Sequence, residues 1–471
     1  LARHASTGGA DTLRSALYGA TALFRLGRAA EAERAFDAAL ARLPEAERAA
    51  YVDLARVLSP DDAGTFRLEG DRFAREFWAA ADPRRLTREN ERRAEHFARI
   101  TEADLLFGSG DTPGRDTAPG RVYVRYGSPG RRALIPNLYR GDRLYPMVWL
   151  WDYGDFQLTF GHTGLFADAG IGAIDVYSPP ASMMREESAQ RDDNVTRVAR
   201  LERSTPEQTT YALPITAKVP VQTYAFRDEA GRTEVVVAFG VPLVPEVSGQ
   251  GDVKLPVRTA VTVFDGLRQV VAEQRRSYAR LADTSTVARP EGDLWVSAET
   301  FRLEVGQATL HVEFDALQGR AGGYERHALT VPAMGSTLRL SDLMLAHRAV
   351  ADSSGTPFGY VRRGRQAYLP SADGLFARTA PLHAYVEAYG LGQRSGRTDY
   401  EIETTLLPER GRDRRGGITT RFAGGGVGPD AAYPVRLDAS RLPAGAYTLT
   451  IRFHDRVSGR TAEATRRVTL F

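Results

Sequence analysis

The hydrophobic and polar positions between Phe77 and Leu105 follow the spacing of helices. Small or apolar residues recur three and four positions apart and form one narrow stripe: Ala94, Phe97, Ala98, Thr101 and Leu105. The opposite face carries charged side chains: Arg88, Glu89, Arg92, Arg93, Glu95 and Glu102. The pattern predicts a helix that lies on a surface, with Thr87 as its N-cap. A preceding helix with Phe77 and Trp78 is predicted to end at Asp82-Pro83, because proline disfavours helical backbone in the residue before it.

From residue 121 onward the spacing of apolar residues changes to two, which is typical of strands. A strand over 121–126 is predicted to place these residues on one face: Val122, Val124 and Tyr126. Its other face carries Arg121, Tyr123 and Arg125. After a Gly-Ser-Pro-Gly turn at 127–130, two alternating runs predict a hairpin: Trp149, Trp151 and Tyr153, then Phe156, Leu158 and Phe160. We expect the preceding helices to cover this strand and hairpin.

Residues 12–57 are alanine-rich and have a helical pattern. Their small and bulky positions have the spacing of one tetratricopeptide-type (TPR-like) repeat: Leu23, Gly27, Ala32, Phe36, Ala39 and Pro44. One such repeat cannot bury its own apolar face, so it must pack on the central domain, on further repeats or on a partner. A helical hairpin that caps its own domain is the interpretation we favour.

Beyond residue 205 the chain has the pattern of short strands with regular turns. Asp265-Gly266 predicts the turn of one hairpin, and Gly306-Gln307 predicts a second. Further strands alternate from residue 341, and the glycine-rich stretch 407–430 is predicted to be a long loop. These patterns predict two β-sandwiches of immunoglobulin-like or fibronectin-like type. In the preceding mixed region, Ile171–Val176 is predicted as a short strand and Met183–Leu201 as a charged connector.

Four short motifs in the central stretch resemble the GWxTD-domain family of bacterial extracytoplasmic proteins. They are FW at 77–78, DP at 82–83, NE at 90–91 and GRVYVRYGSP at 120–129. The segment matching the family's name motif is 114–121, in which these residues fit: Gly114, Thr117, Gly120 and Arg121. Arg115 replaces the motif tryptophan and Ala118 its aspartate, so the signature is eroded. A family site at those two positions would be missing here.

The resemblance covers roughly residues 60–185 and, more loosely, the C-terminal β region. It implies a fold and a bacterial extracytoplasmic location, whereas the family's biochemical role is not established. With the periodicities above, we expect a multidomain α+β protein. The expected parts are a TPR-like helical segment (1–57), a GWxTD-like α+β domain with its connector (58–204) and two β-sandwich domains (205–340 and 341–471).

Composition narrows the class of protein. The 471 residues suggest about three or four domains, and 42% hydrophobic with 26% charged residues is typical of a globular chain. No apolar run is long enough to span a membrane. The chain begins at Leu1, so we expect that a signal peptide has been removed or omitted, with the protein on the periplasmic or extracellular face. Peripheral membrane association or a lipid anchor remains open.

Charge and cysteine content exclude several functions. The chain has no cysteine, which excludes disulfides, thiolate metal sites and cysteine nucleophiles. Lys218 and Lys254 are its only lysines, so nearly all of the 62 basic residues are arginines. These are interleaved with acidic residues rather than concentrated, and the net charge is only +3, so we expect no nucleic-acid partner.

Motifs that carry chemistry are scarce. The sequence has no HExxH, EF-hand, GxGxxG, P-loop or GxSxG pattern, so we expect no metal or cofactor and no enzyme activity. Glu91 and Glu95 share a helix face next to His96, but the arginines around them favour a solvated ion-pair face over a carboxylate site. A site assembled from residues distant in sequence stays open.

Three sets of residues are candidate interaction surfaces. Trp149 and Trp151 could stack on sugar rings or receive a partner, although a place in the domain core is the favoured interpretation. Arg121 and Arg125 could grip an anion from one strand face. A cluster of arginines in the predicted loop, with Arg412 and Arg414 at its centre, could contact acidic lipid or protein.

These observations give three hypotheses. The preferred one is a non-enzymatic extracytoplasmic scaffold or accessory subunit that binds other proteins, in a larger membrane-associated assembly with a membrane-embedded complex. The second is a carbohydrate- or cell-wall-binding protein that uses its aromatic side chains. The third is an enzyme with its site at the junction of helix and strand in the central domain, using Glu91, Glu95 or Arg121.

Overall fold

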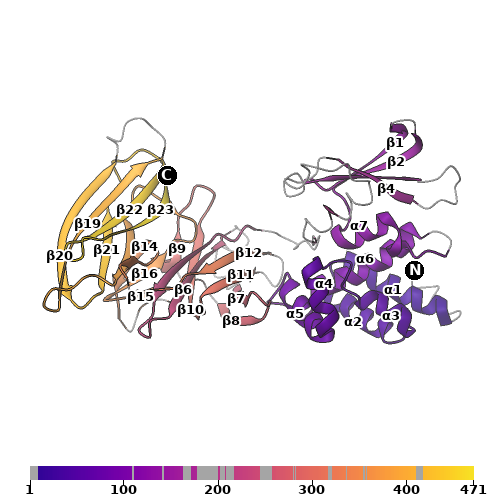
Figure 1. Cartoon of the computed structure of the whole chain (residues 1–471), viewed down its shortest axis with the longest axis horizontal. Helices are drawn as coiled ribbons and strands as arrows, with labels where there is room; N and C mark the ends of the chain where they lie inside the picture. The colour runs from indigo at the N-terminus through magenta and orange to yellow at the C-terminus, as the bar shows by residue number, and fades with distance from the viewer. Residues whose placement is uncertain are drawn as a thin grey trace. The chain divides into compact units, whose positions relative to one another are not determined.

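The chain forms two compact units, Leu1–Ala212 and Leu213–Phe471 (Figure 1). The computed structural model describes residues 9–108, 111–140, 143–162, 171–177, 200–201, 207, 217–243, 257–278, 281, 283–316, 321–335, 337–353, 356, 358–409 and 417–471. Within these residues the α-helices belong to the first unit, and the second is built from β-sheets in which every strand pair is antiparallel except β17 with β23. None of the described helices combines the length and the apolar character needed to cross a membrane.

Five helices form the N-terminal part of the first unit: α1 (Gly9–Arg25), α2 (Ala29–Leu40), α3 (Glu45–Val52), α4 (Pro60–Glu69) and α5 (Asp71–Ala81). α1 and α2 are the pair that the repeat spacing predicts, and Ala20 and Ala32 are buried where the two helices approach. Both helices pack on α6 (Glu91–Phe107), where Phe36 meets Phe97 with ring centroids 5.7 Å apart. The helical pair therefore caps its own unit.

The boundary between α5 and α6 was only partly predictable. α5 ends at Ala81, directly before Asp82-Pro83, as proline chemistry predicts. The N-cap of α6 is Asn90 rather than Thr87, and its side chain accepts a hydrogen bond from the backbone N–H of Arg93 at 2.8 Å. The Thr87 hydroxyl instead donates to Glu91 Oε1 at 2.9 Å, so the predicted cap is wrong.

The predicted strand over 121–126 is also wrong. A short 3-10 turn, η1 (Gly114–Asp116), leads into helix α7 (Ala118–Tyr126). Thr117 caps this helix by accepting from the N–H of Gly120 at 3.2 Å, and Pro119 suits its first turn. Gly127 ends it with a positive φ of 76°, which glycine adopts readily. Side chains of both predicted strand faces are buried, because α7 is enclosed by its neighbours.

An antiparallel sheet completes the first unit in the order β1-β2-β3-β4. Its strands are β1 (Arg131–Arg140), β2 (Arg143–Asp152), β3 (Gln157–His162) and β4 (Ile171–Tyr177). The hairpin predicted from the alternating aromatic residues is β2–β3, with Trp151 opposite Leu158, and the predicted strand over 171–176 is β4. The predicted connector over 183–201 lies almost entirely outside the described residues.

The second unit begins with two four-stranded sheets, in which the strands are ordered β5-β6-β10-β9 and β12-β11-β7-β8. The strands are β5 (Val221–Arg227), β6 (Thr233–Pro242), β7 (Val257–Asp265), β8 (Val270–Tyr278), β9 (Thr286–Val287), β10 (Leu294–Leu303), β11 (Gly306–Ala316) and β12 (Ala321–Val331). The two sheets share one apolar core and form the first sandwich. The predicted hairpin at Asp265-Gly266 joins β7 and β8, whereas the predicted hairpin at Gly306-Gln307 is wrong, because β10 and β11 belong to different sheets.

The second sandwich has the sheet orders β13-β18-β14-β16-β15, with β21 on β18, and β17-β23-β22-β19-β20. Its strands are β13 (Arg339–Leu340), β14 (Met344–Ala351), β15 (Val361–Arg363), β16 (Gln366–Pro370), β17 (Leu375–Phe376), β18 (Leu382–Tyr389), β19 (Arg397–Pro408), β20 (Ile418–Val427), β21 (Ala431–Leu437), β22 (Gly445–Asp455) and β23 (Thr461–Leu470). The predicted loop over 407–430 is wrong in part, because β20 forms within it. Pairing with β19 outweighs the low strand propensity of its glycines.

The two sandwiches meet through a further apolar core, here called the junction core. Strand β6 shows how this arises: Val235 and Val237 point into the first sandwich, while Val236 and Ala238 point into the junction core. The junction core also contains Tyr224, Phe226, Ala298, Met344, Ala346, Val361, Tyr368 and Tyr385. The outer face of the β5-β6-β10-β9 sheet thus packs against the second sandwich. The second unit is therefore a stack of four sheets with three apolar cores between them.

Candidate functional site

The predicted solvated face of α6 is buried in the structure. Each of these polar residues is at most 1% exposed: Glu91, Arg92, Glu95, His96 and Arg99. Leu105, predicted to lie in the buried stripe, is 62% exposed. The reason is that α1, α2, α3, α5, η1 and α7 all pack on α6. The fully buried Ala94, Ala98 and Ala103 are the sequence signal for this, because small residues let neighbours approach a helix from more than one side.

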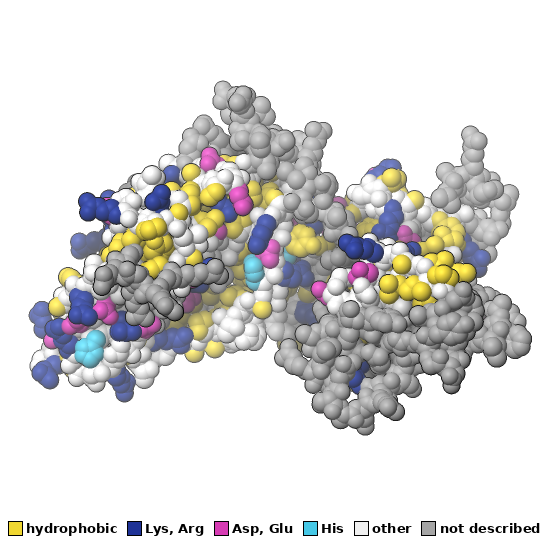
Figure 2. Space-filling view, turned by 90° about the horizontal axis from the view of Figure 1, so that it is seen from above, with side chains coloured by type: hydrophobic (Ala, Val, Ile, Leu, Met, Phe, Trp, Pro, Cys, Tyr) yellow, Lys and Arg dark blue, Asp and Glu magenta, His cyan; other side chains and the backbone are white. Residues whose placement is uncertain are grey.

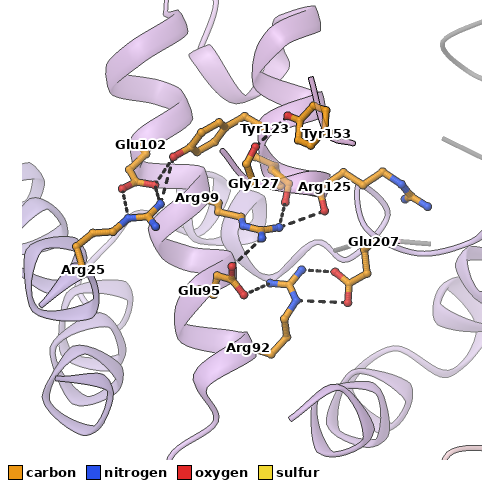
Figure 3. Close-up of polar contacts among 11 residues, drawn as sticks. Arg25, Arg92, Glu95, Arg99, Glu102, Tyr123, Arg125, Gly127, Tyr153 and Glu207 are labelled. Carbon is orange, nitrogen blue, oxygen red and sulfur yellow. Dashed lines mark hydrogen bonds and ion pairs between the residues drawn. The ribbon is translucent and has the colours of Figure 1, made fainter. Parts of the chain in front are cut away.

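A buried ion network is centred on Glu95 (Figure 3). Arg99 Nη2 donates to Glu95 Oε1 at 2.7 Å, and Arg92 Nη1 lies 3.9 Å from Glu95 Oε2. Arg92 also pairs with Glu207, which is distant in sequence. Arg99 Nη1 donates to two backbone carbonyls at the end of α7, those of Val124 at 3.2 Å and Arg125 at 3.1 Å. The network therefore ties α6 to α7 and to residue 207.

Burial controls the proton affinities around this network. The pKa of Arg99 is lowered by loss of hydration, an effect that the carboxylate of Glu95 opposes. The pKa of His96 is well below its usual range, because the ring is fully buried and lies near the positive charges of Arg92 and Arg99. His96 Nε2 lies 3.2 Å from the carbonyl oxygen of Tyr51. A neutral, enclosed imidazole of this kind is a packing residue rather than an accessible general base.

Glu91 is a second buried carboxyl group on the same helix. Burial, and then the negative charge of Asp82, raises its pKa to about 9. Its Oε1 accepts from the Thr87 hydroxyl at 2.9 Å, while no described residue hydrogen-bonds to its buried Oε2. At neutral pH Glu91 is therefore protonated, whereas Glu95 is ion-paired with Arg99 and lies 3.9 Å from Arg92. The two carboxyl groups thus have different environments on one helix.

Stability should depend on pH through Glu91. Since its pKa is higher in the folded chain than in the unfolded one, the folded state keeps a proton that the unfolded state loses as pH rises. Protonated Glu91 therefore stabilises the folded state at acidic pH, and this stabilisation is lost progressively as the pH rises to about 9. We expect the first unit of the parent chain to lose about 4 kcal/mol between about pH 5 and about pH 8 relative to Glu91→Gln. Urea denaturation across this range, followed by tryptophan fluorescence, measures the difference; parallel pH profiles would contradict it.

A second charged cluster links α1, α6 and α7 at the edge of the network. Arg25 Nε donates to Glu102 Oε1 at 2.6 Å, and the Tyr123 hydroxyl donates to Glu102 Oε2 at 2.8 Å. The hydrogen bond to Glu102 raises the pKa of Arg25 above its ordinary value. These contacts connect three elements through one carboxylate (Figure 3). The cluster thus extends the tie between α6 and α7 to the N-terminal helix.

The two arginines predicted to share one strand face do not act together. Because α7 is a helix, Arg125 turns inward and donates to the carbonyls of Leu58 at 3.2 Å and Arg56 at 3.3 Å. Arg121 is exposed and donates to the carbonyl of Asp116 at 2.9 Å. The prediction that Arg121 and Arg125 share one strand face that binds an anion is therefore wrong. Arg121 also lies apart from the buried Glu91 and Glu95.

The predicted aromatic platform is largely core. Trp151 is 4% exposed, and its ring packs at 5.5 Å from Phe107 and 4.7 Å from Phe160, measured between centroids. Trp149 is partly buried against the same core. The favoured interpretation of these residues as core is confirmed for Trp151, which cannot stack on a sugar ring. The other predicted surface, Arg412 and Arg414, lies outside the described residues.

Three residues on which the resemblance rests, Gly114, Thr117 and Gly120, have packing roles. Thr117 accepts from the N–H of Gly120 and donates to the carbonyl of Gly114 at 2.7 Å, which joins η1 to α7. A Cβ atom added to Gly114 would lie 1.9 Å from the carbonyl oxygen of Ala103 in α6. One added to Gly120 would lie 1.7 Å from the carbonyl oxygen of Gly114. The retained residues thus allow η1, α6 and α7 to approach closely.

Substitution of Gly120 tests this role. Gly120→Ala should lower the free energy of unfolding of the first unit by about 1 to 3 kcal/mol, because backbone atoms must shift to admit the methyl group. Gly19→Ala is the matched control: Gly19 lies within α1 with open space around it, so alanine should be neutral or stabilise by up to about 1 kcal/mol. Chemical denaturation of both variants measures the two changes in the free energy of unfolding. Equal changes would show that the close approach of the backbone at Gly114 to Gly120 does not matter for stability.

Cavities occur in both units. In the first, a cavity of about 450 Å³ lies beside α6, and the ion pair between Asp104 and Arg115 forms part of its wall. In the second, a cavity of about 960 Å³ lies where the sandwiches meet. Its arginines are each paired with a carboxylate of the same unit: Arg227 with Asp430, Arg302 with Asp228, and Arg363 with Glu234. The pairs of Arg227 and Arg363 join the two sandwiches, whereas the pair of Arg302 lies within the first.

Neither grouped metal-binding side chains nor surface charge points to a further site in the described residues. In the described part of the chain, no group of three His, Asp or Glu side chains is placed to hold a metal ion. On the face shown in Figure 2, the described basic side chains are scattered among acidic and apolar ones. No protein-family model matches this chain, and no curated protein matches its sequence.

Proposed function

We propose that this protein is a non-enzymatic scaffold or accessory subunit that binds other proteins. Following the resemblance to GWxTD-domain proteins, it acts on the periplasmic or extracellular face of a bacterium. There it belongs to a larger assembly associated with the membrane. The helical first unit and the stacked sheets of the second are its structural parts.

The junction core of the second unit carries this proposal. Phe226 from the first sandwich packs against Tyr385 from the second, with ring centroids 6.1 Å apart. The Arg363 guanidinium lies 4.0 Å from the centre of the Phe226 ring and also pairs with Glu234. Tyr224 donates to the carbonyl of Ser371 at 2.8 Å. Apolar and polar contacts together join the two sandwiches, which suits an element that holds a binding surface in a fixed orientation.

The ion network of the first unit supports the same proposal. Glu95 is fully enclosed between Arg92 and Arg99, and Arg99 also satisfies the carbonyls that end α7. A general acid or base must come within hydrogen-bond reach of its substrate. A carboxylate sealed in this way fixes the relative positions of helices instead.

Native fractionation tests the proposed function. A tagged full-length chain, expressed in its own cells, is solubilised in mild detergent, separated on a native gel and analysed by mass spectrometry. We expect it to migrate in a larger assembly with at least one other protein at constant stoichiometry. Recovery as a free monomer at every salt and detergent concentration would overturn the proposal.

A further inference from the structure

The cavity where the two sandwiches meet, here called the junction cavity, has a volume of about 960 Å³. This is large enough to hold a small molecule or several side chains. The first sandwich contributes the turn between β5 and β6, residues 228–231, and the second contributes parts of β18 and β21. The main-chain N–H of Arg227 donates to the Tyr389 hydroxyl at 2.9 Å. The cavity therefore has walls from both sandwiches, and hydrogen bonds connect them.

Acidic side chains outnumber basic ones in the wall of the junction cavity. The three arginines that line it each pair with one carboxylate, at Asp430, Asp228 and Glu234. Two further carboxyl groups line the same cavity, those of Glu229 and Glu387, and no described basic side chain forms an ion pair with either. Glu229 is exposed on the turn, whereas Glu387 is partly buried. Glu387 is therefore a carboxyl group in the cavity wall that lacks a cationic partner among the described residues.

Glu387 lies on the face of β18 that is turned toward the first sandwich. Tyr385 and Tyr389 share this face, because they alternate with residues of the second sandwich's own core: Ala384, Val386 and Ala388. The Tyr385 hydroxyl donates to Glu387 Oε1 at 2.9 Å, and the Tyr389 hydroxyl donates to Oε2 at 2.6 Å. Both tyrosines are 3% exposed, so they hold the carboxyl group in one place. A carboxylate has about four acceptor positions, so two hydroxyls leave about half of them for a ligand.

The residue opposite Glu387 on the neighbouring strand is Ala432 of β21. Directly opposite residues of an antiparallel pair place their side chains on the same face of the sheet. Ala432 is exposed and also lines the cavity, so open space lies beside the carboxyl group on this strand. Met334 adds a further apolar part of the wall. A carboxyl group next to an apolar wall suits a charged head on an aliphatic stem.

From this geometry we propose that the junction cavity binds a cationic group with several N–H donors, a guanidinium or a primary ammonium, on the carboxylate of Glu387. Its N–H groups occupy the acceptor positions that the two tyrosines leave, and its aliphatic stem lies against Ala432 and Met334. An anion is disfavoured, because each arginine of the cavity already has a carboxylate partner. The cation belongs either to a free amine or guanidine or to a basic side chain of a protein partner. Its binding to the isolated chain does not require the proposed function.

Calorimetric titration of the purified full-length chain with two probes tests the charge requirement. Acetyl-arginine amide carries the cation, and acetyl-citrulline amide has nearly the same shape with a neutral urea group. We expect the arginine probe to bind at least about tenfold more tightly, because hydrogen bonds between opposite charges are stronger than neutral ones. Equal affinities of the two probes, or no binding of the arginine probe, would overturn the proposal.

Two substitutions locate the probe on Glu387. Glu387→Gln removes the charge, and Ala432→Arg supplies a guanidinium from the opposite strand while Glu387 and its tyrosines stay in place. The matched controls are Glu401→Gln and Ala423→Arg, because these two residues also lie opposite each other, on β19 and β20, and neither lines the cavity. We expect each cavity variant to weaken binding of the arginine probe at least about tenfold and each control to leave it unchanged.

Unfolding curves followed by Trp295 fluorescence show whether each variant is folded. If Glu387→Gln does not fold, Ala432→Arg decides, since position 432 is exposed. Undiminished binding of the arginine probe to folded Ala432→Arg overturns the proposal.

Native fractionation then distinguishes the two sources of the cation. Loss of a protein partner from Ala432→Arg, with its retention by Ala423→Arg, assigns the cation to a basic side chain of that partner. Retention of every partner by an Ala432→Arg chain that no longer binds the probe assigns it to a free amine or guanidine. A chain recovered only as free monomer overturns the proposed function alone, whereas failure of the arginine probe to bind overturns only the cation site.

Discussion

Glu95→Gln is expected to lower the free energy of unfolding of the first unit by about 3 to 5 kcal/mol. The substitution keeps the shape of the side chain but removes the negative charge between Arg92 and Arg99, both fully buried. Glu207 still pairs with Arg92, whereas Arg99 loses the carboxylate to which its Nη2 donates and keeps its hydrogen bonds to the carbonyls of Val124 and Arg125. An uncompensated buried charge is costly because it has lost its hydration.

Urea denaturation followed by tryptophan fluorescence measures this effect, since Trp78, Trp149 and Trp151 all lie in the first unit. Glu31→Gln is the matched control: it removes the same charge from an arginine–glutamate pair on a helix, but Arg28 and Glu31 are exposed. We expect no measurable change for it, because water and salt screen surface pairs. Equal effects of the two substitutions would show that the buried network does not stabilise the unit.

Phe226→Ala is expected to destabilise the second unit by about 3 to 5 kcal/mol. The ring is fully buried in the junction core, so its removal leaves a cavity between the two sandwiches. The substitution also removes the aromatic contact of Arg363, which would then keep only its pairing with Glu234 and lie beside the cavity. We therefore expect the coupling between the sandwiches to weaken, with unfolding spread over two steps.

Trp295 reports on this variant, because it is the only tryptophan of the second unit and lies in the core of the first sandwich. Fluorescence and far-ultraviolet circular dichroism should give one transition for the parent chain and separate transitions for Phe226→Ala. Phe422→Ala removes the same side chain from an exposed position and should cost less than about 1 kcal/mol. A single unshifted transition for Phe226→Ala would mean that the junction core does not join the sandwiches.

Local signals in the sequence placed many elements correctly. Proline at position 83 marks the end of α5, and alternating valines followed by Asp265-Gly266 mark β7, its turn and β8. The repeat spacing between Leu23 and Pro44 identifies the helical pair α1–α2. In each case the determining interactions lie within a few residues of the chain, so the residues alone carry the information.

The sequence predicted the buried ion network of α6 only in part. The spacing of Glu91 and Glu95 places both on α6, and Arg92 and Arg99 lie within one turn of Glu95. Sequence spacing cannot distinguish an exposed ion-pair face from a buried one, because that depends on how many neighbours the helix has. The contacts of Arg99 with the end of α7 and of Arg92 with Glu207 join residues far apart in the chain.

What the sequence determined by itself was the class of each half: helices followed by a small sheet, then antiparallel β-structure. Tertiary structure decided the rest. Residues 121–126 alternate like a strand, yet the Thr117 cap, Gly127 and the burial of every residue after Arg121 make them a helix. The glycines of β20 favour a loop by propensity, yet pairing with β19 makes them a strand. Burial and strand pairing are properties of the assembled chain, and they also set the charge state of Glu91 and place Glu387 opposite Ala432 in the junction cavity.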